Sequence, residues 1–559
     1  MNLIAFLKNN WHYILFTIVT FFIYNGFTSF DFVNFDDHLQ VTENIRIQKL
    51  SFQHVKTLFT SHTVGMYQPL TSLILAIIFY FGELNAGYYH SFSLFIHLLN
   101  GFLVFNIFVR LFNIKNYSII AAFLFLAHPI MIESVLWVSA TSTILYVFFY
   151  LLSILSYLSF HKSRKKRDYY LTLLFFLLGI LCKVQMITFV GILFLIDWFY
   201  SKKSFQLKQV LQKTPFLLIA ITFVIVAFFF RDNTAQSITT NYPAWMLAPT
   251  QITWYLYKYL APFSLTVLYD WPTTFGLRES LFSFVFTGLI FIFIKLRHNK
   301  LFVFGSLFFI ITLGIHTAFF IKFLAPYADR YGYISFIGFL IALFALTKKL
   351  KQEKIILTSL FFFALFSYAS KQQINIWKNS ENLWSHNLKS QTTIIANINR
   401  ASYLITKKQY KKALIDIKVI LQSEDKTVTL KEKSSAYYFL GIIYNEENKL
   451  DKSEKSYLKA IELYPERYTP FYNLGNLYSE KLMYSKAIET YTKGIKVETN
   501  FMSLYKNRAN AYYQTKQYYK ALEDVNYSLE LEQKKSKIAV RDTSLLDFKK
   551  ELLMKINNN

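Results

Sequence analysis

The chain has 559 residues, of which 54% are hydrophobic, 19% aromatic and only 17% charged. Soluble domains carry about 25% charged residues. The composition therefore excludes an ordinary single soluble domain and favours a polytopic membrane protein. The formal net charge is +26, yet no compact basic run appears in the polar part, which argues against nucleic-acid binding. The one cysteine, Cys182, excludes an internal disulfide and a cysteine-ligated zinc site.

The chain changes character near residue 371, where apolar runs joined by basic loops give way to a polar sequence. We predict an all-α protein with a membrane helix bundle at 1–370, a connector at 371–392, a repeat α-solenoid at 393–532 and a C-terminal capping helix or tail at 533–559. About eleven membrane spans are expected. They lie near residues 11–28, 88–110, 117–130, 136–160, 169–182, 184–200, 214–230, 280–295, 301–322, 331–347 and 354–370.

Basic residues in the loops predict the orientation of the bundle. They gather at 161–168, 202–213, 295–300 and 348–354, which all lie on one side if the N-terminus is inside. The positive-inside rule places that side in the cytoplasm. The first loop 29–87, the segment 231–279 and the C-terminal part then lie outside. We expect a multi-pass protein of a bacterial inner or plasma membrane, with its C-terminal part on the periplasmic or outer side.

The C-terminal part contains an internal repeat of 34 residues. The segment 438–444 reappears at 472–478 and again at 506–512, and a degenerate earlier unit contains Ala401 and Ala413. This period, with small residues where helices cross, is typical of tetratricopeptide repeats (TPRs). Such stacks bind a protein or peptide on their concave face. The residues expected to pack the helices are Gly441, Tyr444, Ala460, Gly475, Tyr478, Ala487, Ala509, Tyr512 and Ala521.

Acidic residues are scarce in the apolar part, and their densest group is Asp36 with Asp37, just after the first expected span. Adjacent carboxylates bind a divalent cation such as Mg²⁺ or Mn²⁺, or one of them acts as a general base. The alternative is that the pair simply begins an exposed loop.

Further ionisable residues lie at the same outer face. His128 and Glu133 line a pocket or, alternatively, form a buried pair that holds helices together. Arg330 offers a planar fork for a phosphate, or else forms a network with Asp329. Lys183 is a second phosphate contact or a side chain that extends to the membrane interface.

A resemblance to a known family rests on the order of several short motifs and on the terminal repeats. The motifs are Phe35-Asp36-Asp37, Gln68-Pro69-Leu70-Thr71, Leu84-Asn85-Ala86-Gly87 with His90, His128-Pro129 with Glu133 and Trp137, and Ala328-Asp329-Arg330-Tyr331. Together they resemble bacterial relatives of the transmembrane, TPR-containing O-mannosyltransferases. The chain departs from those relatives at 139–143, where uncharged residues replace a charged stretch.

The resemblance implies a GT-C-type membrane glycosyltransferase. Such an enzyme moves a hexose, mannose in the family, from a polyprenyl-phosphate carrier to an acceptor, here expected to be protein hydroxyls, on the non-cytoplasmic face. It implies catalytic roles for Asp36 or Asp37, pocket or orienting roles for His90, His128 and Glu133, and donor-phosphate binding by Arg330 and Lys183. The rival interpretation is a non-catalytic, membrane-anchored TPR scaffold for envelope protein assembly.

Overall fold

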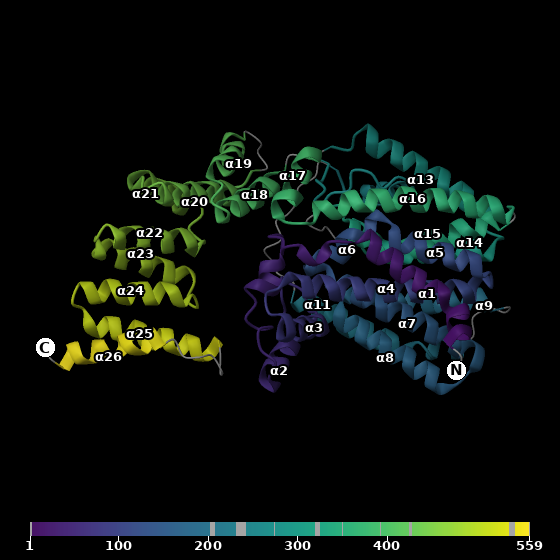
Figure 1. Cartoon of the computed structure of the whole chain (residues 1–559), viewed down its shortest axis with the longest axis horizontal. Helices are drawn as coiled ribbons and strands as arrows, with labels where there is room; N and C mark the ends of the chain where they lie inside the picture. Colours follow the sequence, from purple (N-terminus) through teal and green to yellow (C-terminus); the bar gives the residue numbers. More distant parts are fainter. Residues whose placement is uncertain are drawn as a thin grey trace. The chain divides into compact units, whose positions relative to one another are not determined.

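The computed structural model describes residues 3–201, 207–230, 242–272, 274–318, 325–348, 350–391, 393–423, 428–535 and 543–557. In these ranges all regular elements are helices, and an isolated bridge joins Thr63 to Met66. The all-α prediction is therefore confirmed. The chain divides into two compact units, Met1–Gln391 and Thr392–Asn559 (Figure 1).

The first unit contains the helices α1 to α17. They are α1 (Leu3–Ile23), α2 (Phe52–Thr60), α3 (Pro69–Gly82), α4 (Ala86–Phe112), α5 (Lys115–Ala127), α6 (Ile132–Leu136), α7 (Thr141–Ser163), α8 (Lys166–Cys182), α9 (Phe189–Tyr200), α10 (Leu207–Leu211), α11 (Thr214–Phe229), α12 (Leu247–Leu260), α13 (Leu277–Leu296), α14 (Lys300–Gly314), α15 (Gly332–Thr347), α16 (Gln352–Ile376) and α17 (Ser380–Ser390). The segment expected as a connector thus belongs to this unit up to Gln391.

Five helices among the described residues are long and apolar enough to cross a membrane: Ala86–Phe112, Val138–Ser163, Leu277–Leu296, Asp329–Thr347 and Gln352–Ile376. A sixth results if Lys115–Ala127 and Pro129–Leu136, bent by 54° at their junction, count as one span. The structure thus supports five or six candidates rather than eleven.

The difference arises because a continuous apolar run does not require a continuous helix. The apolar helices Asn10–Ile23, Val184–Tyr200, Thr214–Phe229 and Lys300–Gly314 fall in expected spans but have only 10–17 residues. At 1.5 Å per residue, 17 residues extend about 26 Å, less than a hydrocarbon core of about 30 Å.

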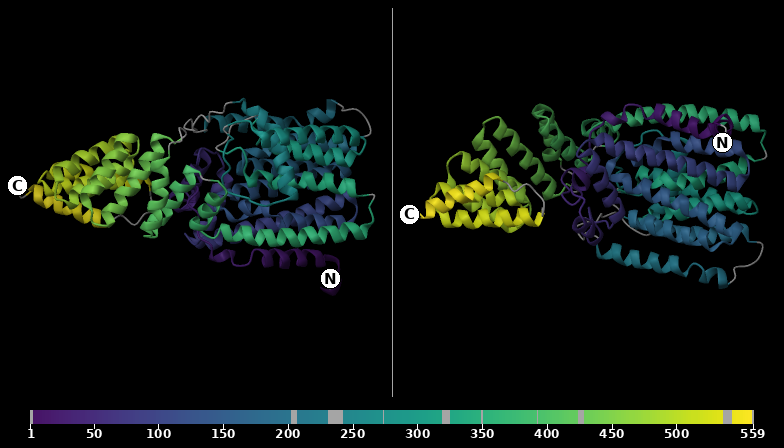
Figure 2. Two further views of the ribbon diagram at one scale, coloured as in Figure 1. Left: turned by 90° about the horizontal axis from the view of Figure 1, so that it is seen from above. Right: turned by 60° about the horizontal axis from the view of Figure 1, so that its bottom comes forward.

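The helices of the first unit run side by side, with the N-terminus at one end and the first loop at the other (Figure 2). The described ends of two of the basic loops are in contact, since Lys300 Nζ donates to the Ser201 carbonyl at 3.3 Å. Some residues used for the orientation lie outside the described ranges, namely 202–206 and 349 of two basic loops and 231–241 and 273 of the expected external segment.

The second unit is a stack of helix pairs. It contains α18 (Ile394–Thr406), α19 (Tyr410–Gln422), α20 (Leu430–Glu446), α21 (Leu450–Leu463), α22 (Tyr468–Glu480), α23 (Tyr484–Val497), α24 (Met502–Gln514), α25 (Tyr518–Lys535) and α26 (Thr543–Asn557). The last helix, α26, packs on α25 through Leu545 and Leu552. It belongs to the expected cap at 533–559, of which residues 536–542 and 558–559 lie outside the described residues.

The paired helices of this unit approach closely where side chains are small. A Cβ atom added to Gly441 would lie 2.4 Å from the Tyr457 ring, and one added to Gly475 would lie 2.4 Å from Tyr491. The other small residues expected at these crossings, Ala460, Ala487, Ala509 and Ala521, are fully buried. The aromatic residues expected beside them differ, since Tyr478 is buried while Tyr444 and Tyr512 are half-buried.

Candidate functional site

The first loop places Asp37 in a fully hydrogen-bonded environment. Its side chain is buried, with Oδ1 accepting from the Ser139 backbone N–H at 2.9 Å and from Ser139 Oγ at 2.5 Å. Oδ2 accepts from the Val33 N–H at 3.0 Å. Burial raises the pKa of Asp37 to about 6, and the hydrogen bonds from Ser139 and Val33 oppose that rise. Because donors occupy both oxygens, Asp37 anchors the loop to the short helix Val138–Ala140.

Asp36 is the strained member of the pair. Its φ of +135° lies in a region that side-chain-bearing residues rarely adopt, at a cost of about 1–3 kcal/mol. The side chain is half-buried, and among the described residues no group donates a hydrogen bond to its carboxylate. Burial raises the pKa of Asp36 to about 7; the Asp37 charge adds to that rise and the Arg330 charge opposes it. Burial therefore favours the protonated form of Asp36, and the charge of Arg330 favours the ionised form.

Arg330 is held from three sides at the N-terminal end of α15. Its Nη1 donates to Glu133 Oε1 at 2.5 Å, and its backbone N–H donates to Glu133 Oε2 at 2.7 Å. The guanidinium carbon lies 4.9 Å from the Trp137 ring centroid and 5.0 Å from that of Tyr331. The side chain keeps 20% of its surface exposed, so the fork is positioned rigidly yet remains accessible. Its counter-ion is Glu133, whereas Asp329 instead accepts a hydrogen bond from Tyr269 at 2.8 Å.

Lys183 is a second cationic residue, and its charge interacts with those of Arg330 and Glu133. Lys183 Nζ donates to Thr143 Oγ1 at 2.7 Å. Burial lowers the pKa of Lys183 to about 7; the Arg330 charge lowers it further, and the Glu133 charge opposes the effect. Lys183 and Arg330 therefore lie within electrostatic range of each other. The buried His316 stacks on Tyr331, with the two ring centroids 4.0 Å apart. The sequence did not predict His316 as a site residue. The one signal for it was a lone imidazole near the end of an apolar run.

The two histidines expected to line the pocket have different surroundings. His128 Nδ1 accepts from the Ile130 N–H at 3.2 Å, and its Nε2 donates to the Tyr259 carbonyl at 3.2 Å. With both ring nitrogens used by the backbone and Glu133 paired to Arg330, no His128–Glu133 pair forms. His90 packs edge-on against Phe30 at 6.3 Å, beside the first loop. The structure thus joins Glu133 to Arg330 directly and places Asp36 and Lys183 within electrostatic range of Arg330, whereas His128 and His90 contact other groups.

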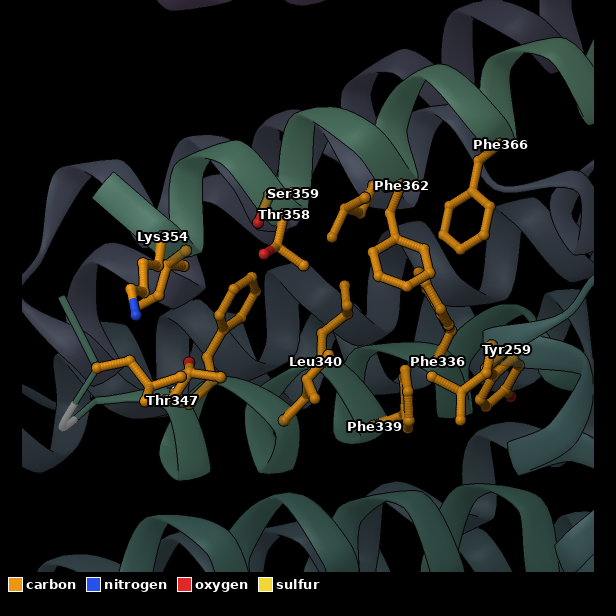
Figure 3. A pocket seen from close by; sticks show the side chains of 16 residues that line it. Tyr259, Phe336, Phe339, Leu340, Thr347, Lys354, Thr358, Ser359, Phe362 and Phe366 are labelled. Atoms are coloured by element: carbon orange, nitrogen blue, oxygen red, sulfur yellow. Dashed lines mark hydrogen bonds between the residues drawn. The ribbon is translucent and has the colours of Figure 1, made fainter. Parts of the chain in front are cut away.

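An apolar cavity of about 190 Å³ lies between α15 and α16. Figure 3 shows it elongated along both helices, with Tyr259 and Phe366 at one end and Thr347 and Lys354 at the other. Its lining is almost entirely aliphatic and aromatic. Phe336 lies six residues after Arg330, which corresponds to about 9 Å along the helix axis. Tyr259, at one end of the cavity, donates to the Gly332 carbonyl at 2.9 Å, two residues after Arg330 in the chain.

The acidic pair does not offer a suitable metal site. Asp37 already accepts three hydrogen bonds, and a cationic guanidinium lies near Asp36. Within the described ranges, no group of three or more His, Cys, Asp or Glu side chains is arranged to hold a metal ion. A hard cation such as Mg²⁺ takes up to six oxygen ligands and is commonly held by carboxylates. The donor set therefore does not fit Mg²⁺ or Mn²⁺, and we derive no step through a metal.

Comparison with known proteins bears on the second unit. The tetratricopeptide repeat family model matches residues 434–467 and 468–501. The C-terminal unit contains TPRs. This confirms the repeat prediction for the two matched units, and such repeats indicate a protein-interaction role. A search of curated proteins finds no match.

Solved structures similar to the chain include two crystal structures of MamA. One is 21% identical, has a TM-score of 0.25 and covers 28% of this chain and 90% of that chain. The second is 20% identical, has a TM-score of 0.24 and covers 29% of this chain and 86% of that chain. The TPR2AB domain of yeast Sti1 in complex with pHSP90 is 17% identical, has a TM-score of 0.16 and covers 32% of this chain and 91% of that chain.

Proposed function

We propose that this protein is a membrane glycosyltransferase that moves a hexose from a polyprenyl-phosphate carrier to a protein hydroxyl on the non-cytoplasmic face of the membrane. The observation that carries the proposal is the environment of Asp36. A half-buried carboxylate with a strained backbone lies within electrostatic range of a fixed guanidinium, and Tyr259, which lines the apolar cavity, is hydrogen-bonded two residues beyond that guanidinium in the chain. Strained residues and carboxylates with raised pKa values cluster at active sites.

The proposed reaction assigns a separate task to each charged group. Asp36 accepts the proton of the acceptor hydroxyl while that oxygen attacks the anomeric carbon of the sugar. The bond between the anomeric carbon and the phosphate oxygen breaks, and the released polyprenyl phosphate carries the additional negative charge. Arg330 and Lys183 stabilise this charge as it develops. Glu133 orients Arg330, and Asp37 holds the loop that bears Asp36.

A lipid-phosphate donor suits the distribution of charge and apolar surface. Its phosphate matches the cationic locus of Arg330 and Lys183, and its isoprenoid tail matches the apolar cavity between α15 and α16. We place this locus on the outer side of a bacterial inner or plasma membrane, in accord with the basic loops at the opposite end of the bundle. We further propose that the TPRs hold the acceptor protein, or a partner of it, on their concave face.

The test compares wild-type protein with Asp36→Asn in membranes supplied with a radiolabelled polyprenyl-phosphate hexose and envelope proteins. The matched control is Asp31→Asn, since Asp31 is exposed in the same loop. Loss of a general base lowers rates by about 10²–10⁴-fold, and we expect the Asp36→Asn variant to fall in that range. Asp31→Asn should transfer label at the wild-type rate. Wild-type transfer by Asp36→Asn would contradict the proposal.

A second candidate function, a non-catalytic scaffold for envelope proteins, is favoured by the family match to the repeats. It predicts that Asp36→Asn fully complements a deletion strain, whereas a variant that disrupts the packing at Gly475 does not. The glycosyltransferase proposal predicts that both variants fail.

A further inference from the structure

The helix α17 contacts the loop that bears Asp36 and a second segment that is hydrogen-bonded to Asp329, the residue before Arg330. It begins after Asn379, whose side chain accepts a hydrogen bond from the Asn382 N–H, so the start of the helix is capped. Trp384 and Asn387 on this helix are fully buried. The sequence predicted no more than a connector at this position.

The first set of contacts joins α17 to the loop that bears Asp36. The Asn34 N–H donates to Ser380 Oγ at 2.9 Å, and Trp384 Nε1 donates to Asn34 Oδ1 at 2.7 Å. The Phe35 ring lies edge-on to Trp384 at 5.4 Å. Asn34 and Phe35 directly precede Asp36, so this helix restrains the backbone on one side of the strained residue.

The second set of contacts joins α17 to the segment after α12. Asn387 Nδ2 donates to Thr266 Oγ1 at 2.6 Å and to the Leu268 carbonyl at 3.0 Å. The Thr266 N–H in turn donates to the Tyr269 hydroxyl at 3.0 Å. That hydroxyl donates to Asp329 at 2.8 Å, one residue before Arg330. A continuous series of hydrogen bonds therefore connects Asn387 with the residue beside Arg330.

We infer that α17 is the element that sets Asp36 and Arg330 relative to each other, with Ser380, Trp384 and Asn387 as positioning residues. These residues are spaced at i, i+4 and i+7, and so they share one face of a rigid helix. Neither of the contacted segments is a regular helix at the contact, and each needs external restraint to keep one geometry. The inference about reactivity rests on the proposed function, whereas the restraint itself does not.

Hydrogen exchange on the full-length protein measures the restraint without any assay of activity. Trp384→Phe keeps an aromatic ring and removes the donor to Asn34, and Ser380→Ala removes the hydroxyl acceptor. We expect each to accelerate amide exchange in residues 31–37 at least tenfold. Asn387→Ala should do the same in residues 265–270. Two controls should retain wild-type exchange: Lys389→Ala, which alters an exposed residue of the same helix, and Ser380→Thr, which keeps a hydroxyl.

Steady-state transfer then tests whether the restraint matters for the reaction. We expect Ser380→Ala and Trp384→Phe to lower kcat about tenfold with the KM for the polyprenyl-phosphate hexose unchanged, because neither residue lines the cavity. Ser380→Thr should recover the wild-type kcat, which a general loss of folded protein would not explain.

The two measurements separate failure of this inference from failure of the proposed function. Unchanged exchange in all three variants would overturn the positioning role of α17. Accelerated exchange with an unaltered kcat would overturn its bearing on the reaction. If the wild-type protein transfers no hexose, the proposed function fails, and the exchange data alone still decide whether α17 restrains the two segments.

Discussion

The titration of Asp36 provides the sharpest test of its proposed role. Burial and the neighbouring Asp37 charge raise its pKa to about 7, against the opposing effect of Arg330. A general base acts only in its ionised form. We therefore expect kcat/KM for hexose transfer to rise about tenfold per pH unit below pH 7 and to level off above it. A carboxylate with an ordinary pKa would already have reached its plateau near pH 5.

Asp37→Asn is the perturbation that should move this pH profile in a known direction. If the two carboxylates are taken to be about 6 Å apart, their charges interact by about 1.4 kcal/mol at an effective dielectric constant of about 40, which corresponds to about one pKa unit. Removing the like charge lowers the pKa of Asp36, so the acidic limb should shift toward lower pH by about one unit. The nearby charged groups that remain, Arg330, Lys183 and Glu133, are unaltered by this change.

The assay measures initial rates of transfer between pH 5 and 9 at constant ionic strength, because salt screens the interaction between the charges. Asp31→Asn serves as the control, and its profile should coincide with that of the wild type. An acidic limb centred near pH 4 in the wild-type protein would refute the argument from burial. A limb that does not move in Asp37→Asn, when that variant is folded and active, would place the general base at a residue other than Asp36.

Three further predictions follow from the packing. Glu133→Gln leaves the Arg330 guanidinium without its counter-charge. We expect thermal unfolding in detergent to show that the free energy of unfolding falls by about 3 kcal/mol, the lower end for a broken buried pair. An unchanged unfolding midpoint would contradict this. Gly475→Ala places a Cβ atom 2.4 Å from the Tyr491 ring and should cost about 1–3 kcal/mol in denaturant unfolding followed by circular dichroism. Leu340→Trp fills part of the apolar cavity. It should raise the KM for the lipid donor several-fold while kcat is retained. A wild-type KM would show that the lipid tail binds elsewhere.

The C-terminal repeats could be predicted from the sequence because their packing is local. Each helix contacts the helices adjacent to it in the chain, so a small residue recurs at the crossing of each pair: Gly441, Gly475 and Ala509. Gly441 and Gly475, 34 residues apart, each meet a tyrosine ring 16 residues later in the chain. The apolar composition likewise determined that the first part is an all-helical bundle. Because charged residues are scarce there, Asp36 and Arg330 could be predicted as candidate site residues.

The number of long helices and the geometry of the site were decided only by the tertiary structure. Hydropathy cannot show where an apolar run breaks into two helices, as at the 54° bend after Ala127. Two adjacent aspartates look equivalent in sequence. In the structure, however, the Asp37 carboxylate accepts hydrogen bonds from Ser139, whereas Asp36 has a positive φ.

The long-range partners have the same origin. Glu133 and Arg330 are 197 residues apart, and Asn34 and Trp384 are 350 residues apart. Local periodicity determines the helices and repeats of this protein. The pairing of charged groups depends on how helices distant in the chain pack together, and the local sequence does not determine that packing.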